Sequence, residues 1–361
     1  MDQIHVTPQL VQEACLAITD SYTGLGLGLP SILREVVIED KLINLKFSLG
    51  YPFNEATRQT IIQSVQSHLT TVFPTYSFSI ILNWKIQAHH PKKAIKALPN
   101  IKNIIAIASG KGGVGKSTIA LNISLALLQQ GARVGLLDAD IYGPSLPLLL
   151  GLPHLQPNPT KTLQPLLRYG LQTMSLGYLI NSEAPAMWRG PMASTAVKQL
   201  LTETAWDNLD YLIIDLPPGT GDIQLTLAQQ LPLNGVVMAT TAAPLSQIDV
   251  IKAIQMFQKL EINILGIVEN LSSYTCNHCG HHDMLFPGDA GNQISKQFSI
   301  PLLANIPFNK ISYPKEEGMM LATDFPLQAV YGDLARKVAA LISLQSINYS
   351  VGLPPIKLEV P

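Results

Sequence analysis

The sequence has few charged residues, few cysteines and no long apolar run, and each shortage excludes a class of protein. Charged residues make up 14% of the chain and the formal net charge is −1, so no positive excess favours nucleic acid or an acidic membrane surface. No apolar stretch approaches the roughly 18 residues of a membrane span. Three cysteines are too few for a disulfide framework in a chain of 361 residues. We therefore expect a cytoplasmic protein with no nucleic-acid or membrane partner.

Hydrophobic residues, by contrast, are abundant, at 47% of the chain. Such a composition indicates a large buried core or a large self-association surface, and the length suffices for two domains. Shifts in composition and periodicity predict a small α+β domain, a linker, a larger domain and a loosely ordered tail, over residues 1–88, 89–100, 101–345 and 346–361.

The first of these domains begins with a helix signal. Thr7 and Pro8 suit an N-cap and a first helical position, and Leu10, Ala14 and Ile18 recur every four residues, as on one helical face. Further on, period-two alternation, helical spacing and alternation again predict a strand, a helix and a strand over residues 43–49, 61–72 and 76–84. This order suits a sheet that is covered on one face.

From residue 101 the pattern changes to short aliphatic runs separated by helical stretches. The runs are "NIIAIAS", "RVGLLDAD", "YLIIDLPPG" and "NGVVMATT". Uninterrupted apolar strands that alternate with helices are typical of a parallel sheet buried on both faces. We therefore predict an α/β fold with a mostly parallel, doubly wound sheet for this domain.

A phosphate-binding loop lies between the first of these strands and a helical stretch. "SGKGGVGKST" fits the pattern G-x-x-x-x-G-K-[ST], in which glycines let backbone N–H groups surround phosphate oxygens and the helix adds its positive end. Lys116 is expected to reach the β- and γ-phosphates of ATP, and the Ser117 hydroxyl to hold Mg²⁺. The predicted nucleotide contacts are Gly110, Lys111, Gly112, Gly113, Val114, Gly115, Lys116, Ser117 and Thr118.

Acidic residues end two other predicted strands. Asp138 and Asp140 follow the strand in "LLDADIYGPS", and Asp215 ends the strand in "YLIIDLPPGTGD". Carboxylates at the carboxyl ends of parallel strands face the ligand crevice of an open α/β sheet. We predict that Asp215 binds Mg²⁺, directly or through water, and that Gly219 lies in a mobile switch. For Asp138, helix capping is the alternative.

Two of the three cysteines form a hook in "SSYTCNHCGHH". A pair of cysteines such as Cys276 and Cys279 normally provides two of the four ligands of a metal site. The third cysteine, Cys15, lies far away on the first predicted helix, where we expect a buried core thiol. One chain therefore cannot supply four thiolates locally, whereas two chains can. Four soft ligands on a dimer axis suit an iron–sulfur cluster or zinc.

Other interpretations of the hook remain open at this point. A zinc site within one chain would use both cysteines and two of the neighbouring histidines His278, His281 and His282. A thioredoxin-like redox pair and an inert turn are further alternatives.

Lys111, directly after the first glycine of the loop, gives the pattern K-G-G-x-G-K-[ST]. This resembles the deviant Walker A motif of the ParA, MinD and nitrogenase iron protein superfamily. The resemblance implies a homodimer in which Lys111 crosses to the nucleotide of the partner subunit. It also implies that Asp140 positions the attacking water, so that Lys111, Lys116 and Asp140 would be the catalytic residues.

The same superfamily resemblance implies that Asp138 lies near Mg²⁺. It further implies that Asn270, which we expect to end the strand "ILGIVEN", contacts the nucleotide base. A turn residue is the alternative for this asparagine.

Taken together, "SGKGGVGKST", "DADIYGPS", "WRGPM", "IIDLPPGTGD" and "VENLSSYTCNHCGHH" resemble the Mrp/ApbC family of iron–sulfur cluster carrier ATPases. The resemblance implies a slow ATPase that holds a cluster, expected to be [4Fe-4S], between Cys276 and Cys279 of two subunits. Its partners would be cluster-assembly proteins and the apoproteins that accept the cluster. The first domain resembles, more weakly, the MIP18-type domain that precedes the ATPase in this family.

Some features depart from the family, and two rivals remain. "SYTGLGLGLPSIL" replaces the usual "DPE…DLGLI"-like segment, and "ATTAAPLSQID" replaces "TTPQDIALID".

One rival function is a MinD- or ParA-like switch without metal, which predicts a basic amphipathic C-terminal helix or a basic DNA-binding face. The other is an electron-transfer reductase like the nitrogenase iron protein, whose two ligating cysteines per subunit are far apart in sequence.

Overall fold

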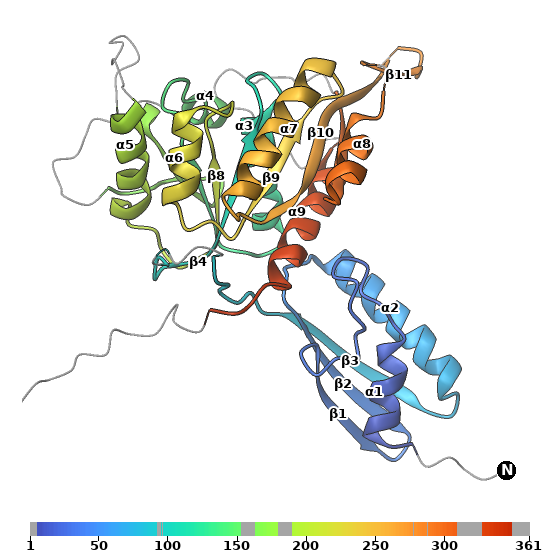
Figure 1. The fold of residues 1–361 in the computed structure, drawn as a ribbon. Coiled ribbons are helices and arrows are strands. Elements are labelled where there is room, and N and C mark those ends of the chain that lie inside the picture. Colours follow the sequence, from blue (N-terminus) through green and yellow to red (C-terminus); the bar gives the residue numbers. More distant parts are fainter. Residues whose placement is uncertain are drawn as a thin grey trace, which may run out of the picture.

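The computed structural model describes residues 6–91, 95, 97–152, 163–179, 190–276, 278–286, 288–308 and 327–348. Trp188 and Arg189 of "WRGPM", and the tail from residue 349, lie outside the described residues. A small three-stranded unit and a large nine-stranded sheet make up the described part of the chain. Figure 1 shows the small unit hanging from one end of the large one, beside the last helix.

The small unit has the predicted order of helix, strands, helix and strand. Its elements are α1 (Pro8–Leu16), β1 (Leu33–Glu39), β2 (Leu42–Leu49), α2 (Glu55–Val72) and β3 (Ser77–Trp84). The central strand β2 pairs antiparallel with β1 and parallel with β3. Every second residue of β2 is buried, from Ile43 to Leu49, which confirms the predicted alternation.

Helix α1 starts as predicted but buries a different face. The Thr7 hydroxyl accepts a hydrogen bond from the Leu10 backbone N–H and caps the helix. The buried side chains are Val11 and Cys15, whereas Leu10 is 38% exposed. The prediction is wrong for Leu10, whereas Ala14 is partly buried against the core and Ile18, just after the helix, is buried. The buried side of the helix is centred on Val11 and Cys15, one residue along from the predicted stripe.

The large sheet is mostly parallel. Its strands are β4 (Ile101–Ser109), β5 (Val134–Asp138), β6 (Leu166–Arg168), β7 (Leu171–Ser175), β8 (Leu209–Asp215), β9 (Gly235–Thr240), β10 (Ile264–Thr275), β11 (His282–Met284) and β12 (Leu302–Phe308). The order is β11-β10-β9-β4-β8-β5-β7-β6, and β12 also pairs with β10. Only β6 and β11 pair antiparallel, each with the strand next to it in the chain.

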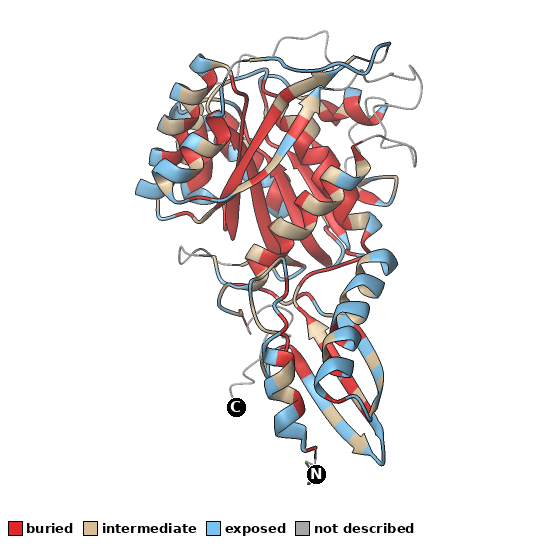
Figure 2. Ribbon diagram, turned by 90° about the vertical axis from the view of Figure 1, so that its right-hand side faces the viewer, coloured by how far each residue is buried: buried red, intermediate tan, exposed pale blue. Residues whose placement is uncertain are grey.

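Helices cover both faces of this sheet, which confirms the doubly wound α/β prediction. They are α3 (Lys116–Gln129), α4 (Leu146–Leu150), the 3₁₀ turn η1 (Leu176–Tyr178), α5 (Gly190–Glu203), α6 (Asp222–Gln230), α7 (Pro244–Lys259), α8 (Ala290–Phe298) and α9 (Gln328–Ser343). Alternate residues of β4 serve the two faces: Ile105 and Ile107 join the core of α3, α4 and α9, and Ile104 and Ala106 join that of α5 to α8. Figure 2 shows the strands as the buried centre.

The small unit is fixed to the large one through α9 and the segment after β3. The Tyr22 hydroxyl donates to Asp333 at 3.1 Å and accepts from Arg336 Nε at 2.8 Å, both on α9. The Asn348 N–H donates to the Ala88 carbonyl at 2.6 Å. The His90 N–H donates to the Ser346 carbonyl at 3.0 Å. The first residues of the predicted tail thus pair with the end of the predicted small domain and the start of the predicted linker, while the domain boundaries themselves remain predictions.

Buried asparagines hold the same junction from the side of the large sheet. Asn234 Oδ1 accepts from the Ile104 N–H at 2.7 Å, and its Nδ2 donates to the His89 carbonyl at 2.8 Å. His89 Nδ1 lies 2.9 Å from Asn103 Oδ1. Buried polar groups are stable only when they are hydrogen-bonded, so this network specifies one arrangement of the chain.

Across the described residues, no helix combines the length and apolar character that a membrane crossing needs.

Candidate functional site

The phosphate-binding loop depends on glycine at three positions, for two reasons. Gly113 and Gly115 have φ of 82° and 85°, in the left-handed region where a side chain is strained. A Cβ atom on Gly115 would also lie 2.3 Å from Asn270 Nδ2, and one on Gly110 would lie 2.2 Å from the Asp249 carbonyl carbon in α7. The loop therefore packs closely against α7 and β10, and it requires glycine at three of the positions where the sequence motif has it.

Helix α3 begins directly after this loop. Its N-cap residue is Gly115, which has no side chain to accept a hydrogen bond from the first N–H groups of the helix. The first N–H groups of a helix have no partner within the helix and attract anions together with the helix dipole. The loop and the helix start thus provide the donors that a nucleotide phosphate requires.

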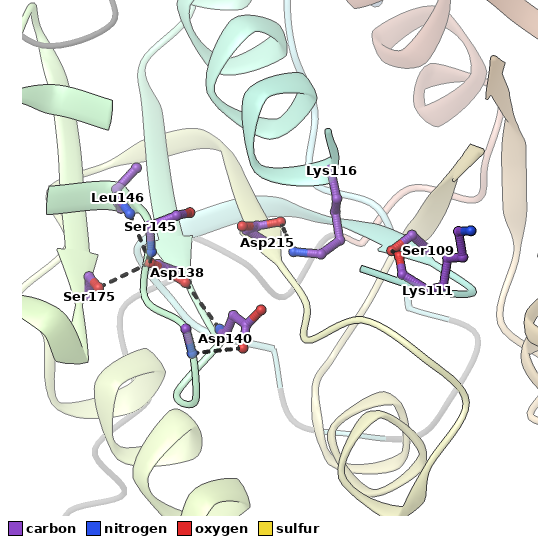
Figure 3. Close-up of polar contacts among 10 residues, drawn as sticks. Ser109, Lys111, Lys116, Asp138, Asp140, Ser145, Leu146, Ser175 and Asp215 are labelled. Carbon is purple, nitrogen blue, oxygen red and sulfur yellow. Dashed lines mark hydrogen bonds and ion pairs between the residues drawn. The ribbon is translucent and has the colours of Figure 1, made fainter. Parts of the chain in front are cut away.

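The two lysines of the motif are not brought together. Lys116 Nζ lies 2.5 Å from Asp215 Oδ1, and both side chains are almost fully buried, with 6% and 4% exposure. Figure 3 shows Lys111 on the far side of the loop, pointing away from this pair. The ammonium group expected to contact phosphates is therefore neutralised here by the acid expected to bind Mg²⁺.

Asp138 organises the loop that follows β5. Its carboxylate accepts four hydrogen bonds of 3.0 to 3.1 Å, from the N–H groups of Asp140, Ser145 and Leu146 and from the Ser175 hydroxyl (Figure 3). Burial and the nearby charge of Asp215 raise the pKa of Asp138. The carboxylate thus caps the first turn of α4, which is the alternative that the sequence left open.

Ser175 is a residue of this network that sequence analysis missed. It lies on β7, whose pairing with β5 places Ser175 opposite Asp138. Only the strand order of the sheet would have identified it.

Asp140 stands closer to solvent. It is half-buried, and Oδ1 accepts from the Gly143 N–H at 3.3 Å. Burial raises its pKa, with a smaller increase from Asp215 and an opposing effect of Lys116. Asp140 also lines a cleft of about 480 Å³ together with Tyr142, Pro218 and Gly190.

Asn270 braces the phosphate loop. Its side chain is buried, and Nδ2 donates to the Val114 carbonyl at 2.9 Å. The prediction that the strand ends at this residue is wrong, because β10 continues to Thr275. The apolar pattern stops here because the strand is irregular after Asn270: Leu271 has φ of 54°, and the register with β12 shifts between Asn270 and Tyr274.

The cysteine hook forms the tip of the hairpin between β10 and β11. The Cys276 N–H donates to the His281 carbonyl at 2.8 Å, and the Gly280 N–H donates to the Cys276 carbonyl at 2.8 Å. Cys279 is exposed and Cys276 half-buried. Backbone N–H groups of Cys279 and His278 are the main causes of a lowered pKa at the Cys276 thiol. Figure 1 shows the hairpin extending from the end of the large sheet.

The hook's own histidines do not complete a metal site. Within the described ranges, which include Cys276, Cys279, His278, His281 and His282, no three His, Cys, Asp or Glu side chains come together as ligands. The third cysteine, Cys15, is buried, and burial raises its pKa to about 11, which confirms the expected core thiol.

Comparison with known proteins agrees with these motifs. Residues 100–339 match the family described as ParA: NUBPL iron-transfer P-loop NTPase. The chain belongs to this family. Membership confirms the resemblance stated above and makes the protein a nucleotide-binding member of a class whose general reaction is ATP hydrolysis.

Several relatives carry informative names. A Haemophilus influenzae protein named "Iron-sulfur cluster carrier protein" is 49% identical over 279 residues, covering 77% of this chain and 75% of its own. A Dictyostelium discoideum protein named "Iron-sulfur cluster transfer protein NUBPL" is 38% identical over 310 residues, covering 82% and 93%. A nucleotide-binding protein of Archaeoglobus fulgidus, solved with ADP, is 33% identical with a TM-score of 0.51, covering 66% and 88%.

The buried Lys116–Asp215 pair leads to a prediction about stability. We expect Lys116→Met to lower the free energy of unfolding by about 3–5 kcal/mol, because it leaves Asp215 buried without its cation. We expect Lys116→Met combined with Asp215→Leu to recover much of this loss. Denaturant unfolding without nucleotide measures both variants.

A surface pair provides the matched control for this prediction. Lys252 and Asp249 lie 3.5 Å apart with 60% and 34% exposure, so Lys252→Met is expected to change the free energy of unfolding by less than about 0.5 kcal/mol. Equal losses for Lys116→Met and Lys252→Met would contradict the assignment of Lys116–Asp215 as a structural ion pair.

Proposed function

We propose that this protein is a homodimeric ATPase that binds an iron–sulfur cluster and transfers it to acceptor apoproteins in the cytoplasm. The observation that carries the proposal is the exposed hairpin tip, where Cys276 and Cys279 lie two residues apart with no third ligand from the described part of their own chain. Cluster carrier names among the relatives point to the same chemistry.

The proposed ligand set is completed by a second subunit. Each chain contributes two thiolates, so a pair of hooks facing each other across a twofold axis provides the four that a [4Fe-4S] cluster takes. Hydrogen bonds from the backbone N–H groups of Cys279 and His278 favour the thiolate form of Cys276, which is the form that binds iron. Exposure of Cys279 gives an acceptor protein access to the cluster.

A variant of the hook tests this assignment. We expect Cys276→Ser/Cys279→Ser to lose nearly all bound iron and sulfide after anaerobic reconstitution, because hydroxyls are poor ligands for iron in clusters. Metal and sulfide analysis measures the content. The control is His278→Ala/His281→Ala, which changes the same hairpin and is expected to keep the cluster; iron and sulfide retained by the serine variant would rule out the hook as the binding site.

The nucleotide site fits a magnesium-bound triphosphate. Hard oxygen donors suit Mg²⁺, and we assign the ion to the Ser117 hydroxyl and the Asp215 carboxylate, where it would offset phosphate charge. Lys116 would exchange Asp215 for β- and γ-phosphate oxygens. Asp140, half-exposed at the edge of the cleft, would orient the attacking water, and Lys111 would reach the nucleotide of the partner subunit.

Strand β10 connects the two sites. Asn270 contacts the phosphate loop through the Val114 carbonyl, and the strand then continues to Thr275 and directly into Cys276. The path is short, because the bulge places Asn270 and Tyr274 opposite Ile306 and Phe308 of β12, which are only two residues apart. A shift of the loop on nucleotide binding would therefore move the base of the hairpin, and slow hydrolysis would be coupled in this way to holding or releasing the cluster.

Removing the contact at Asn270 tests the coupling. We expect Asn270→Ala to keep normal cluster content, but to reduce the effect of ATP on the cluster transfer rate about fivefold, which corresponds to one hydrogen bond of about 1 kcal/mol. Transfer to an apo-ferredoxin, with and without ATP, measures this effect. Asn305→Ala on the exposed side of β12 is the control; an unchanged ATP effect in Asn270→Ala would exclude this route.

A further inference from the structure

A groove lies at the junction between the small unit and the large one, away from both sites described above. It has a volume of about 280 Å³. Its wall is formed by the loop before β1 and the start of β1, by the end of β2, by the segment after β3, and by the end of α9 with the residues that follow it. Gly50 makes the close approach possible, because a Cβ atom there would lie 2.7 Å from Ser343 Cβ.

Among the described residues, two cationic side chains line the groove and no acidic one does. The cations are Arg34 and Lys85. The Lys85 ammonium has no ion pair or hydrogen bond with any described residue, and the Arg34 guanidinium contacts only the Pro30 carbonyl, at 3.4 Å. The carboxyl end of α9 adds a partial negative charge of about −0.5, which is too small to cancel two full positive charges.

Neutral hydrogen-bonding groups also line the groove. The Ser31 and Ser48 hydroxyls line the groove and have no partner among the described residues. The Ser343 hydroxyl donates to the Ala340 carbonyl at 2.7 Å. His89, buried and bonded to Asn103 through Nδ1, adds a polar edge. The wall therefore offers donors and positive charge without a competing carboxylate.

We propose that this groove binds a small anion carrying carboxylate or phosphate oxygens. A guanidinium and an ammonium are the side chains that recognise such oxygens. The volume lies at the lower limit of ligand pockets, which run from about 300 to 1,000 Å³, so it suits a small anion and not a nucleotide. The proposal goes beyond cluster transfer and does not depend on it.

An anion in this groove would contact both units at once. Arg34 and Ser48 belong to the small unit, whereas Ser343 ends α9. Helix α9 also packs along α3, whose first residue is Lys116 of the phosphate loop. Binding would thus stabilise one arrangement of the small unit relative to the ATPase core.

Calorimetric titration of the full-length protein tests the proposal, with phosphate and malonate as separate probes. Saturating ADP is present throughout, so that the phosphate loop is filled and does not bind the probe. We expect saturable binding of at least one probe, weakened at least tenfold in Arg34→Gln/Lys85→Gln. The control is Lys46→Gln, because Lys46 is an exposed lysine of β2 that lies outside the groove and 4.0 Å from Glu35.

The outcomes separate the possible ligands and the failure of the proposal. Binding of malonate alone indicates a carboxylate ligand, and binding of phosphate alone indicates a phosphate ligand. No saturable binding of either probe, or equal affinity in native protein and in Arg34→Gln/Lys85→Gln, would overturn the proposal. Cluster content, measured separately, stays unchanged in either case, so the result is independent of the hook.

Discussion

The cysteine supply is the constraint on which the proposed mechanism depends. Each chain presents two thiols at the end of a hairpin, and its third cysteine is buried in another part of the molecule. A cluster bound by this hook alone would keep iron sites without protein ligands, so the proposed state is a dimer with both hooks at one axis. An exposed, shared site of this kind is also one from which a cluster can leave, as a carrier requires.

The second feature is that one strand contacts the phosphate loop and also leads to the hook. Asn270 is buried against the phosphate loop, and its strand continues past a bulge to Thr275, the residue before Cys276. The irregularity at Leu271 comes after Glu269, the last residue that pairs with β9, so the proposed shift of the strand at that point would leave this pairing intact. The buried Lys116–Asp215 ion pair is a second element of the proposed coupling, because phosphate oxygens would replace Asp215 as the partner of Lys116.

Much of this architecture was predictable from local sequence. The phosphate loop, the parallel strands and the hook are contiguous motifs, and their chemistry follows from residues that are close in the chain. What sequence could not provide was pairing between distant segments. Ser175 reaches Asp138 only because β7 lies beside β5. Val11 and Cys15 are the buried residues of α1, rather than Leu10, because packing against the sheet, which period alone does not show, fixes the rotation of the helix. The strand bulge hid the true length of β10 for a similar reason: period alone does not show a bulge.

Native mass spectrometry of the anaerobically reconstituted protein tests the shared cluster most directly. We predict that cluster mass is found only on species containing two chains, with one cluster for each pair, and that single chains carry none. A cluster retained on single chains of 39.2 kDa would contradict a site built from two subunits.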